Sequence, residues 1–167
     1  MRQTLPFQHV NQPGTASYRA DLQRHHLIPR QVMEMPSFSR MLAAVGRHRL
    51  GYDDFRRNGL LLPASELAAL ETGMPLHRGP HRSYNQLVIE RVGIIEGGWS
   101  RVARLDHGRA SSDAAMRLDL LQCALRRKLL SRSRRGRRTL LNRRDPLRGG
   151  QDFAMLDALV DELWGTV

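Results

Sequence analysis

The most regular feature of the chain is the recurrence of apolar residues at helical spacing. Between residues 38 and 45, four of them fall at positions i, i+3, i+4 and i+7. Ser37 precedes this stripe and favours a helix N-terminus, and Gly46 follows it and favours a helix end. Similar patterns predict helices over residues 66–70, from Pro80 to the glycines at 97 and 98, over residues 113–130 and over residues 152–164.

Two other segments are predicted to be extended. Asn58-Gly59 is a strong turn signal, and it leads into the apolar run Leu60 to Leu62, which Pro63 ends. The segment from Tyr18 to Pro29 is predicted as a strand or loop exit, because a proline disfavours helical backbone at the residue before it. The chain therefore mixes extended and helical segments.

The predicted helix over residues 113–130 follows a predicted linker over residues 101–113. Four residues recur along this helix at helical spacing and are expected to face the core. They are Met116, Leu120, Cys123 and Leu130. Because Cys123 is the single cysteine, the chain has neither an internal disulfide nor a cysteine-based zinc site.

Charge adds a second feature near the C-terminus. The formal net charge of the chain is +11, and residues 126–148 carry eleven basic residues against one acidic residue. Such a balance favours a polyanionic partner, and nucleic acid before a membrane surface. Lys128 is the only lysine, so a bias of the genome toward arginine is the alternative explanation. Within this run we assign nucleic-acid contacts to Arg134, Arg135, Arg137 and Arg138.

Hydropathy argues against a membrane partner. No stretch approaches the eighteen or so continuous apolar residues that a membrane-spanning helix requires, and residues 1–7 lack the apolar run of a secretory signal. We therefore expect a cytoplasmic protein. A toxin exported by a specialised secretion system would have the same sequence features.

Histidines supply the candidate chemistry, because four of the seven fall in two close groups. His25 and His26 are adjacent, so in a strand they would point to opposite faces, and a strand end or loop must direct both at one substrate. His77 and His81 are four residues apart, with Gly79-Pro80 between them. We expect His77 in a turn, Pro80 at the first helical position and His81 at the start of that helix.

Three motifs in this order resemble the AHH family of the HNH/endonuclease VII nuclease superfamily. The matching residues are His25-His26 with Pro29, then Asn58-Gly59 with Leu62-Pro63, then His77-x-Gly79-x-His81-x-x-Tyr84. The resemblance covers roughly residues 18 to 95. Arg24 stands where the name of the family expects alanine, and about thirty residues separate the histidine pair from Asn58, which implies a helical insertion.

The resemblance implies an α+β fold, with a small ββα core around one metal ion, an inserted helix and additional C-terminal helices. We expect an N-terminal arm over residues 1–17, a nuclease core over residues 18–100 and an arginine-rich helical extension over residues 101–167. The implied activity is metal-dependent hydrolysis of phosphodiester bonds in DNA, with RNA as an alternative substrate.

The resemblance also implies roles for individual residues. His25, His77 and His81 would bind the metal, and His26 would be the general base that activates water, although the roles of His25 and His26 could be exchanged. Asn58 would hold the loop that carries His26 by a side-chain to backbone hydrogen bond. Imidazole ligands favour zinc or nickel, whereas magnesium or manganese could act with waters and substrate phosphate as further ligands.

Arginines flank these positions and could clamp phosphate through two parallel hydrogen bonds. They are Arg24, Arg78 and Arg82, and an ordinary basic surface is the alternative interpretation. Two other functions remain open. The histidines could hold a structural zinc in a nucleic-acid-binding module that does not cleave, although such sites normally use four protein ligands. The domain could also be a toxin nuclease held by an acidic immunity protein, and the helix over residues 152–164 could form a homodimer.

Overall fold

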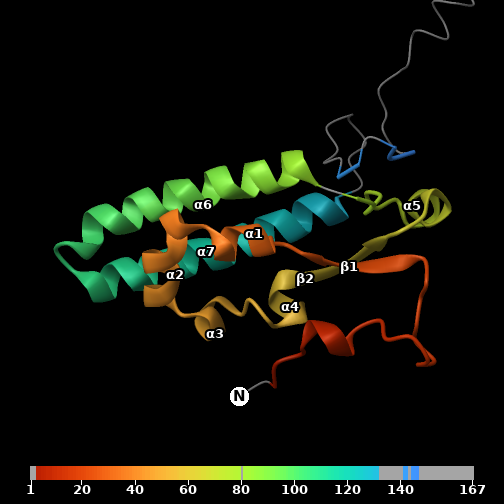
Figure 1. Cartoon of the computed structure of the whole chain (residues 1–167), viewed down its shortest axis with the longest axis horizontal. Coiled ribbons are helices and arrows are strands. Elements are labelled where there is room, and N and C mark those ends of the chain that lie inside the picture. The colour runs from red at the N-terminus through yellow and green to blue at the C-terminus, as the bar shows by residue number, and fades with distance from the viewer. Residues whose placement is uncertain (1–2, 80, 132–140, 143, 147–167) are drawn as a thin grey trace, which may run out of the picture.

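The computed structural model of the chain describes residues 3–79, 81–131, 141–142 and 144–146. The predictions for the helix over residues 152–164, for a homodimer formed through it and for the nucleic-acid contacts of Arg134, Arg135, Arg137 and Arg138 lie outside the described residues. The described part of the chain combines two strands with helices, which confirms the α+β class (Figure 1).

The elements follow in chain order. They are η1 (Phe7–His9), β1 (Leu22–His26), α1 (Arg30–Glu34), η2 (Pro36–Phe38), α2 (Ser39–Val45), α3 (Arg47–Leu50), α4 (Phe55–Asn58), β2 (Gly59–Pro63), α5 (Glu66–Thr72), α6 (Arg82–Ala103) and α7 (His107–Leu130).

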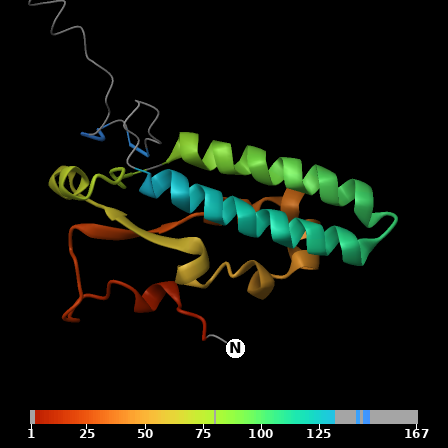
Figure 2. The ribbon, with the colours of Figure 1, turned by 180° about the vertical axis from the view of Figure 1, so that it is seen from behind.

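The two strands form an antiparallel ribbon whose register runs from Leu22 opposite Pro63 to His26 opposite Gly59. Two long helices, α6 and α7, lie side by side and antiparallel in both views (Figures 1 and 2). The segment between the strands packs against this helical pair, as the shared core of buried side chains shows. This core contains Leu27 from the segment after β1, Met41 from α2, Val88 from α6 and Leu118 from α7. None of the described helices has the length and hydropathy needed to cross a bilayer.

The predicted insertion between the strands contains several short helices. The predicted helix over residues 38–45 is present as the end of η2 followed by α2, but Ser37 does not cap it, because Ser37 lies within η2. Helix α1 was not predicted. Pro29 is the N-cap residue of α1. A proline disfavours helical backbone at the residue before it, but a helix can still begin at the residue after it.

Helix α6 does not end at the glycines at 97 and 98, as the sequence had predicted, and the predicted linker over residues 101–113 is also wrong. The helix continues to Ala103, and α7 begins at His107 after Asp106, whose side chain accepts a hydrogen bond from Arg109 N. A glycine inside a helix costs only about 1 kcal/mol relative to alanine. Burial of Ile95 and Trp99 on either side of these glycines offsets that cost.

The face of α7 that packs inward differs from the predicted one. Met116, Leu120 and Leu130 are about half exposed, and Cys123 is exposed, so the prediction that these four residues face the core is wrong. The buried face instead carries small, apolar and polar residues in alternation. They are Ala110, Ser111, Ala114, Ala115, Leu118, Gln122, Leu125 and Leu129. Close packing against α6 selects small side chains, which hydrophobicity alone does not identify.

The N-terminal arm lies on the domain, where Pro6 forms an isolated bridge with Asp54. The division into arm, core and extension stays a prediction. The predicted boundary between core and extension, after residue 100, falls inside α6. Buried residues of α7 also belong to the same hydrophobic core as those of the predicted nuclease core.

We expect Gly97→Ala to stabilise the protein by about 0.5 to 1 kcal/mol, because a β-carbon there would meet no atom within 4 Å and alanine restricts the unfolded chain. Urea unfolding measures this change. Gly59→Ala is the opposing control, since its β-carbon would lie 2.2 Å from Phe55 Cδ2 and should destabilise the fold. A loss of stability in Gly97→Ala would contradict the description of α6 as one unbroken helix.

Candidate metal centre

Strand β1 directs its two adjacent histidines to different surroundings. His25 is buried, with 4 % of its surface exposed, and its ring lies against His77, His81 and Tyr84. The ring of His26 is half-buried and lies against other aromatic rings. This is the alternation expected of neighbouring residues in a strand.

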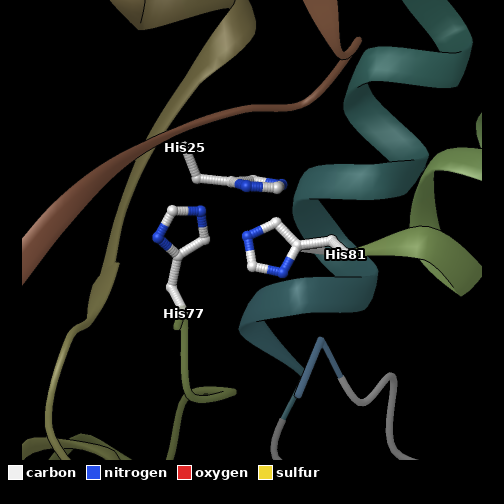
Figure 3. A group of neighbouring side chains, drawn as sticks. All are labelled: His25, His77 and His81. Atoms are coloured by element: carbon white, nitrogen blue, oxygen red, sulfur yellow. The ribbon is translucent and has the colours of Figure 1, made fainter. Parts of the chain in front are cut away.

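Three imidazoles converge from three different parts of the fold (Figure 3). His25 comes from β1, His77 from the loop after α5, and His81 from the N-cap position of α6. The ring centroids are 4.9 Å apart for His25 and His77, 5.6 Å for His25 and His81, and 4.4 Å for His77 and His81. One potential ligand atom from each residue lies within 4.8 Å of the other two. Pro80 lies outside the described residues, and the helix begins at Arg82, one residue after His81.

Hydrogen bonds orient two of these rings from outside. His77 Nδ1 lies 3.2 Å from Gln23 Oε1, and His81 Nδ1 lies 3.2 Å from the carbonyl oxygen of Leu141. The second nitrogen of each ring, Nε2, therefore faces inward, and Figure 3 shows these nitrogens turned toward the group. A bond to one imidazole nitrogen that leaves the other free is the usual arrangement around a metal-binding histidine.

The remaining ring, that of His25, is the most buried of the three. His25 Nε2 is buried and has no hydrogen-bond partner in the described part of the chain. Leaving such a nitrogen unpaired costs roughly 1 to 3 kcal/mol. A divalent ion of the borderline type could be held by one ring nitrogen from each of His25, His77 and His81, since imidazole is the ligand such ions prefer.

The protonation state of the three rings suits metal binding. Burial, followed by the neighbouring His77, lowers the pKa of His25 to about 2. Burial, followed by His81, lowers the pKa of His77 to about 4, and burial also lowers the pKa of His81. All three rings are neutral at pH 7, and only the neutral ring offers a lone pair to a cation.

His26 lies on the side of a separate cleft of about 560 Å³. The Phe7 ring stacks on it with centroids 3.8 Å apart and planes 2° apart, and the Tyr52 ring lies 5.6 Å away. Burial, followed by the charge of Arg30, lowers the pKa of His26. The His26 ring is therefore held parallel to the Phe7 ring. It is also kept neutral, and the neutral form is the one that can accept a proton.

Asn58 holds the backbone immediately after His26. Its Oδ1 accepts a hydrogen bond from Ile28 N at 2.8 Å, and its carbonyl oxygen accepts one from Leu27 N at 2.8 Å. A side-chain to backbone bond of this kind is what the family resemblance implied, but its setting differs. Asn58 ends α4 and is fully buried, so the predicted Asn-Gly turn is absent. The catalytic importance of Asn58 stays a prediction.

The three flanking arginines are exposed and differ in position. Arg24 lies on the opposite face of β1 from His25, and its Nη1 donates to the carbonyl oxygen of Phe7 at 2.9 Å. Arg78 lies in the loop between His77 and His81, and Arg82 is the first residue of α6. Their contacts with phosphate stay predictions.

Sequence reasoning missed several residues that shape this site. Gln23 could have been found, because it precedes His25 by two positions and so shares its face of the strand. Phe7 and Tyr52 gave no such signal, since long-range packing brings them to His26. Leu141 acts through its backbone carbonyl, which no side-chain pattern reveals.

The fold and the three imidazoles define a small α+β protein with a ββα core and a candidate site for a divalent metal. Residues 7–110 match the model of AHH, described as a nuclease family of the HNH/ENDO VII superfamily with conserved AHH. This match covers more than half of the chain, and the chain belongs to that family. No curated protein and no solved structure matches it.

Membership confirms the predicted family and makes the chain a member of a nuclease family, with nucleic acid as its substrate class. Nucleases of this superfamily use a divalent metal, and the group of His25, His77 and His81 could hold one. Arg24 replaces the conserved alanine. Because Arg24 lies on the face of β1 opposite His25, this replacement leaves the three imidazoles unobstructed.

We expect the metal-free protein to lose stability as the pH falls from about 6.5 to about 4. His77 has a pKa of about 4 when folded and an ordinary value near 6.5 when unfolded, so acid protonates the unfolded state first. Stability is therefore highest above pH 6.5 and falls with pH toward 4. Urea unfolding at several pH values measures this slope, which should be shallower in His77→Gln. His9→Gln is the control, since His9 is exposed and outside the site, and an equal slope in all three proteins would contradict the lowered pKa.

Proposed function

We propose that this protein is a metal-dependent endonuclease that hydrolyses phosphodiester bonds of DNA. The observation that carries this proposal is the convergence of the three neutral imidazoles of His25, His77 and His81, with the neutral His26 next to His25 in sequence and facing a separate cleft. A metal site alone would serve binding, and a histidine alone would serve many reactions. Their adjacency in a member of a nuclease family favours hydrolysis of a phosphodiester.

In this proposal His25, His77 and His81 hold the ion. A bound divalent ion supplies charge stabilisation at the phosphoryl oxygens and at the leaving oxygen. Three imidazoles favour zinc or nickel, and magnesium or manganese would complete their coordination with waters and substrate phosphate. Three protein ligands also leave a position open, which favours catalysis over a purely structural zinc.

His26 would accept the proton of the attacking water. It is the last residue of β1, so a phosphate at the end of the strand could approach both His26 and the imidazole group on the other face. Stacking by Phe7 and Tyr52 limits rotation of the ring, and Asn58 fixes the backbone that follows it. These contacts keep the base in one orientation before substrate arrives.

The exposed guanidinium groups of Arg24, Arg78 and Arg82 would contact the phosphate backbone. Arg78 and Arg82 accompany the metal ligands, whereas Arg24 lies on the side of His26. Phosphate contacts of this kind orient the nucleic acid without selecting a sequence. We therefore propose a nuclease of low sequence selectivity.

The central test is cleavage of plasmid DNA, and of RNA in parallel, with magnesium, manganese, zinc or nickel. We expect cleavage that stops when a chelator is added. His26→Ala should lower the turnover number by about 10²- to 10⁴-fold, the usual contribution of a general base, while retaining the metal stoichiometry of the parent. Loss of metal in His26→Ala would assign His26 to the metal instead.

His81→Ala should weaken metal binding by at least about 100-fold, because even the loss of a residue that only orients a ligand costs 10- to 100-fold. Titration with a chromogenic chelator as competitor measures this affinity. His48→Ala is the matched control, since His48 is exposed on α3 away from the site and should bind metal like the parent. Metal binding without cleavage of either polymer would favour the alternative, a zinc-stabilised nucleic-acid-binding module.

The arginine run should supply affinity without sequence choice, because each neutralised phosphate of duplex DNA lowers log affinity by about 0.9 per unit of log salt. Replacing Arg134, Arg135, Arg137 and Arg138 with serine should therefore flatten this slope by up to about 3 to 4 units. Binding measured by fluorescence anisotropy at several salt concentrations gives the slope. An unchanged slope would show that the run contacts another partner, such as an acidic immunity protein.

A further inference from the structure

A segment far from the histidines in sequence returns to the loop that carries two of them. Leu141, Asn142 and Asp145 lie against this loop, which we define as residues 76–79 and 81, and Figure 3 shows the described part of their segment in blue below His81. Leu141 is buried in the main core, so the segment is anchored to the domain on its other side. It lies beyond residues 7–110, the part of the chain that matches the family.

Three hydrogen bonds join the segment to the loop. The carbonyl oxygen of Leu141 lies 3.2 Å from His81 Nδ1, and Asn142 Nδ2 donates to the carbonyl oxygen of Arg78. Leu76 N donates to Asp145 Oδ2 at 2.9 Å, and the Asp145 carboxylate is buried. The bonds therefore fall before His77, between the two histidines and on His81 itself.

We propose that Leu141, Asn142 and Asp145 form a clasp that positions His77 and His81 for the metal ion, an inference that rests on the metal site of the proposed function. The bond to Leu141 requires a proton on His81 Nδ1, which leaves the lone pair on Nε2 facing the other two rings. The bond to Asp145 fixes the backbone immediately before His77. The clasp supplies no ligand and acts through the residues that do.

The loop needs such support because it has little structure of its own. No helix or strand spans residues 76–79, and Gly79 has a φ of +76°, a conformation that other residues rarely adopt. The hydrogen bond of His77 Nδ1 is made to the side chain of Gln23, which is exposed, and His81 is only the N-cap residue of α6. Without the clasp, the free protein would hold the two imidazoles less well and would bind the ion less tightly.

The test compares zinc affinity in full-length variants at Asp145. Asp145→Ala removes the acceptor for Leu76 N and should weaken zinc binding by about 10- to 100-fold, the usual effect of losing a residue that orients metal ligands. Asp145→Asn retains an oxygen that can accept the same hydrogen bond and should stay close to the parent. Asp113→Ala is the matched control, because it removes a carboxylate whose partner, Arg117, is exposed on α7.

Two results would overturn the clasp. One is zinc affinity in Asp145→Ala equal to that of the parent. The other is an equal loss in Asp145→Ala and Asp145→Asn, which would assign the effect to the charge of Asp145 and not to its bond with Leu76. Because the measurement is metal affinity, it remains informative if the parent binds zinc but cleaves no nucleic acid, the result that would overturn the proposed endonuclease alone.

A separate variant guards against loss of folding in Asp145→Ala. Asn142 is half-buried and outside the hydrophobic core, so Asn142→Ala removes the bond to Arg78 without opening the core, and it should also weaken zinc binding. Nitrogen-15 NMR of the metal-free protein gives the tautomer of His81 directly. We expect the Nδ1-protonated form in the parent and a mixture in Asn142→Ala and in folded Asp145→Ala. An unchanged tautomer with unchanged affinity in Asn142→Ala would contradict the clasp.

Discussion

The bonds of Asn58 to the backbone at Leu27 and Ile28 are the interaction on which the rest of this structure depends. They join the start and end of an insertion of about thirty residues, at the point where β1 ends and β2 begins. Asn58 Nδ2 also donates to the carbonyl oxygen of Tyr52, and Gln122 Nε2 donates to Asn58 Oδ1. One buried side chain thus connects the ribbon, the insertion and α7, and each bond left unmade there would cost roughly 1 to 3 kcal/mol.

Fixing the end of β1 in this way separates the two histidines of the motif. Strand geometry turns His25 toward the imidazole group and His26 toward the aromatic rings, and the pairing with β2 prevents the strand from rotating. Both rings are kept neutral, chiefly by burial. Because the fold gives the two adjacent histidines different neighbours, one could bind a metal ion while the other accepts a proton.

The sequence predicted the class of fold, and it singled out the three histidines that the structure brings together, because both depend on short motifs. The spacing of His77 and His81 around a turn limits where their rings can lie, and the family resemblance supplied the partner, His25. The Asn58-Gly59 signal was misread, since the same dipeptide that favours a tight turn here ends a short helix within the core. Local turn chemistry cannot distinguish these two settings, which differ in what packs around Asn58.

The errors in the C-terminal helices have a related cause. The inward face of α7 is defined by close approach to α6, which selects Ala114 and admits Gln122 through its bond to Asn58. A prediction based on hydrophobicity instead chose the larger Met116 and Leu120, which are exposed. The continuation of α6 past Gly97 depends on the same packing. These features follow from contacts between distant segments, which periodicity within one segment does not contain.

The cluster of His25, His77 and His81 lowers the stability of the fold compared with a cluster of apolar residues at the same positions. A buried ring nitrogen without a partner lowers stability, and apolar residues of similar volume would fill the same space without that cost. The rings of His77 and His81 lie beside that of His25, and their outer nitrogens are bonded to Gln23 and Leu141, so their inner nitrogens are directed into the group. An arrangement that is unfavourable without a ligand, and gathers one potential ligand atom from each of three imidazoles within 4.8 Å, is one that a bound cation would stabilise.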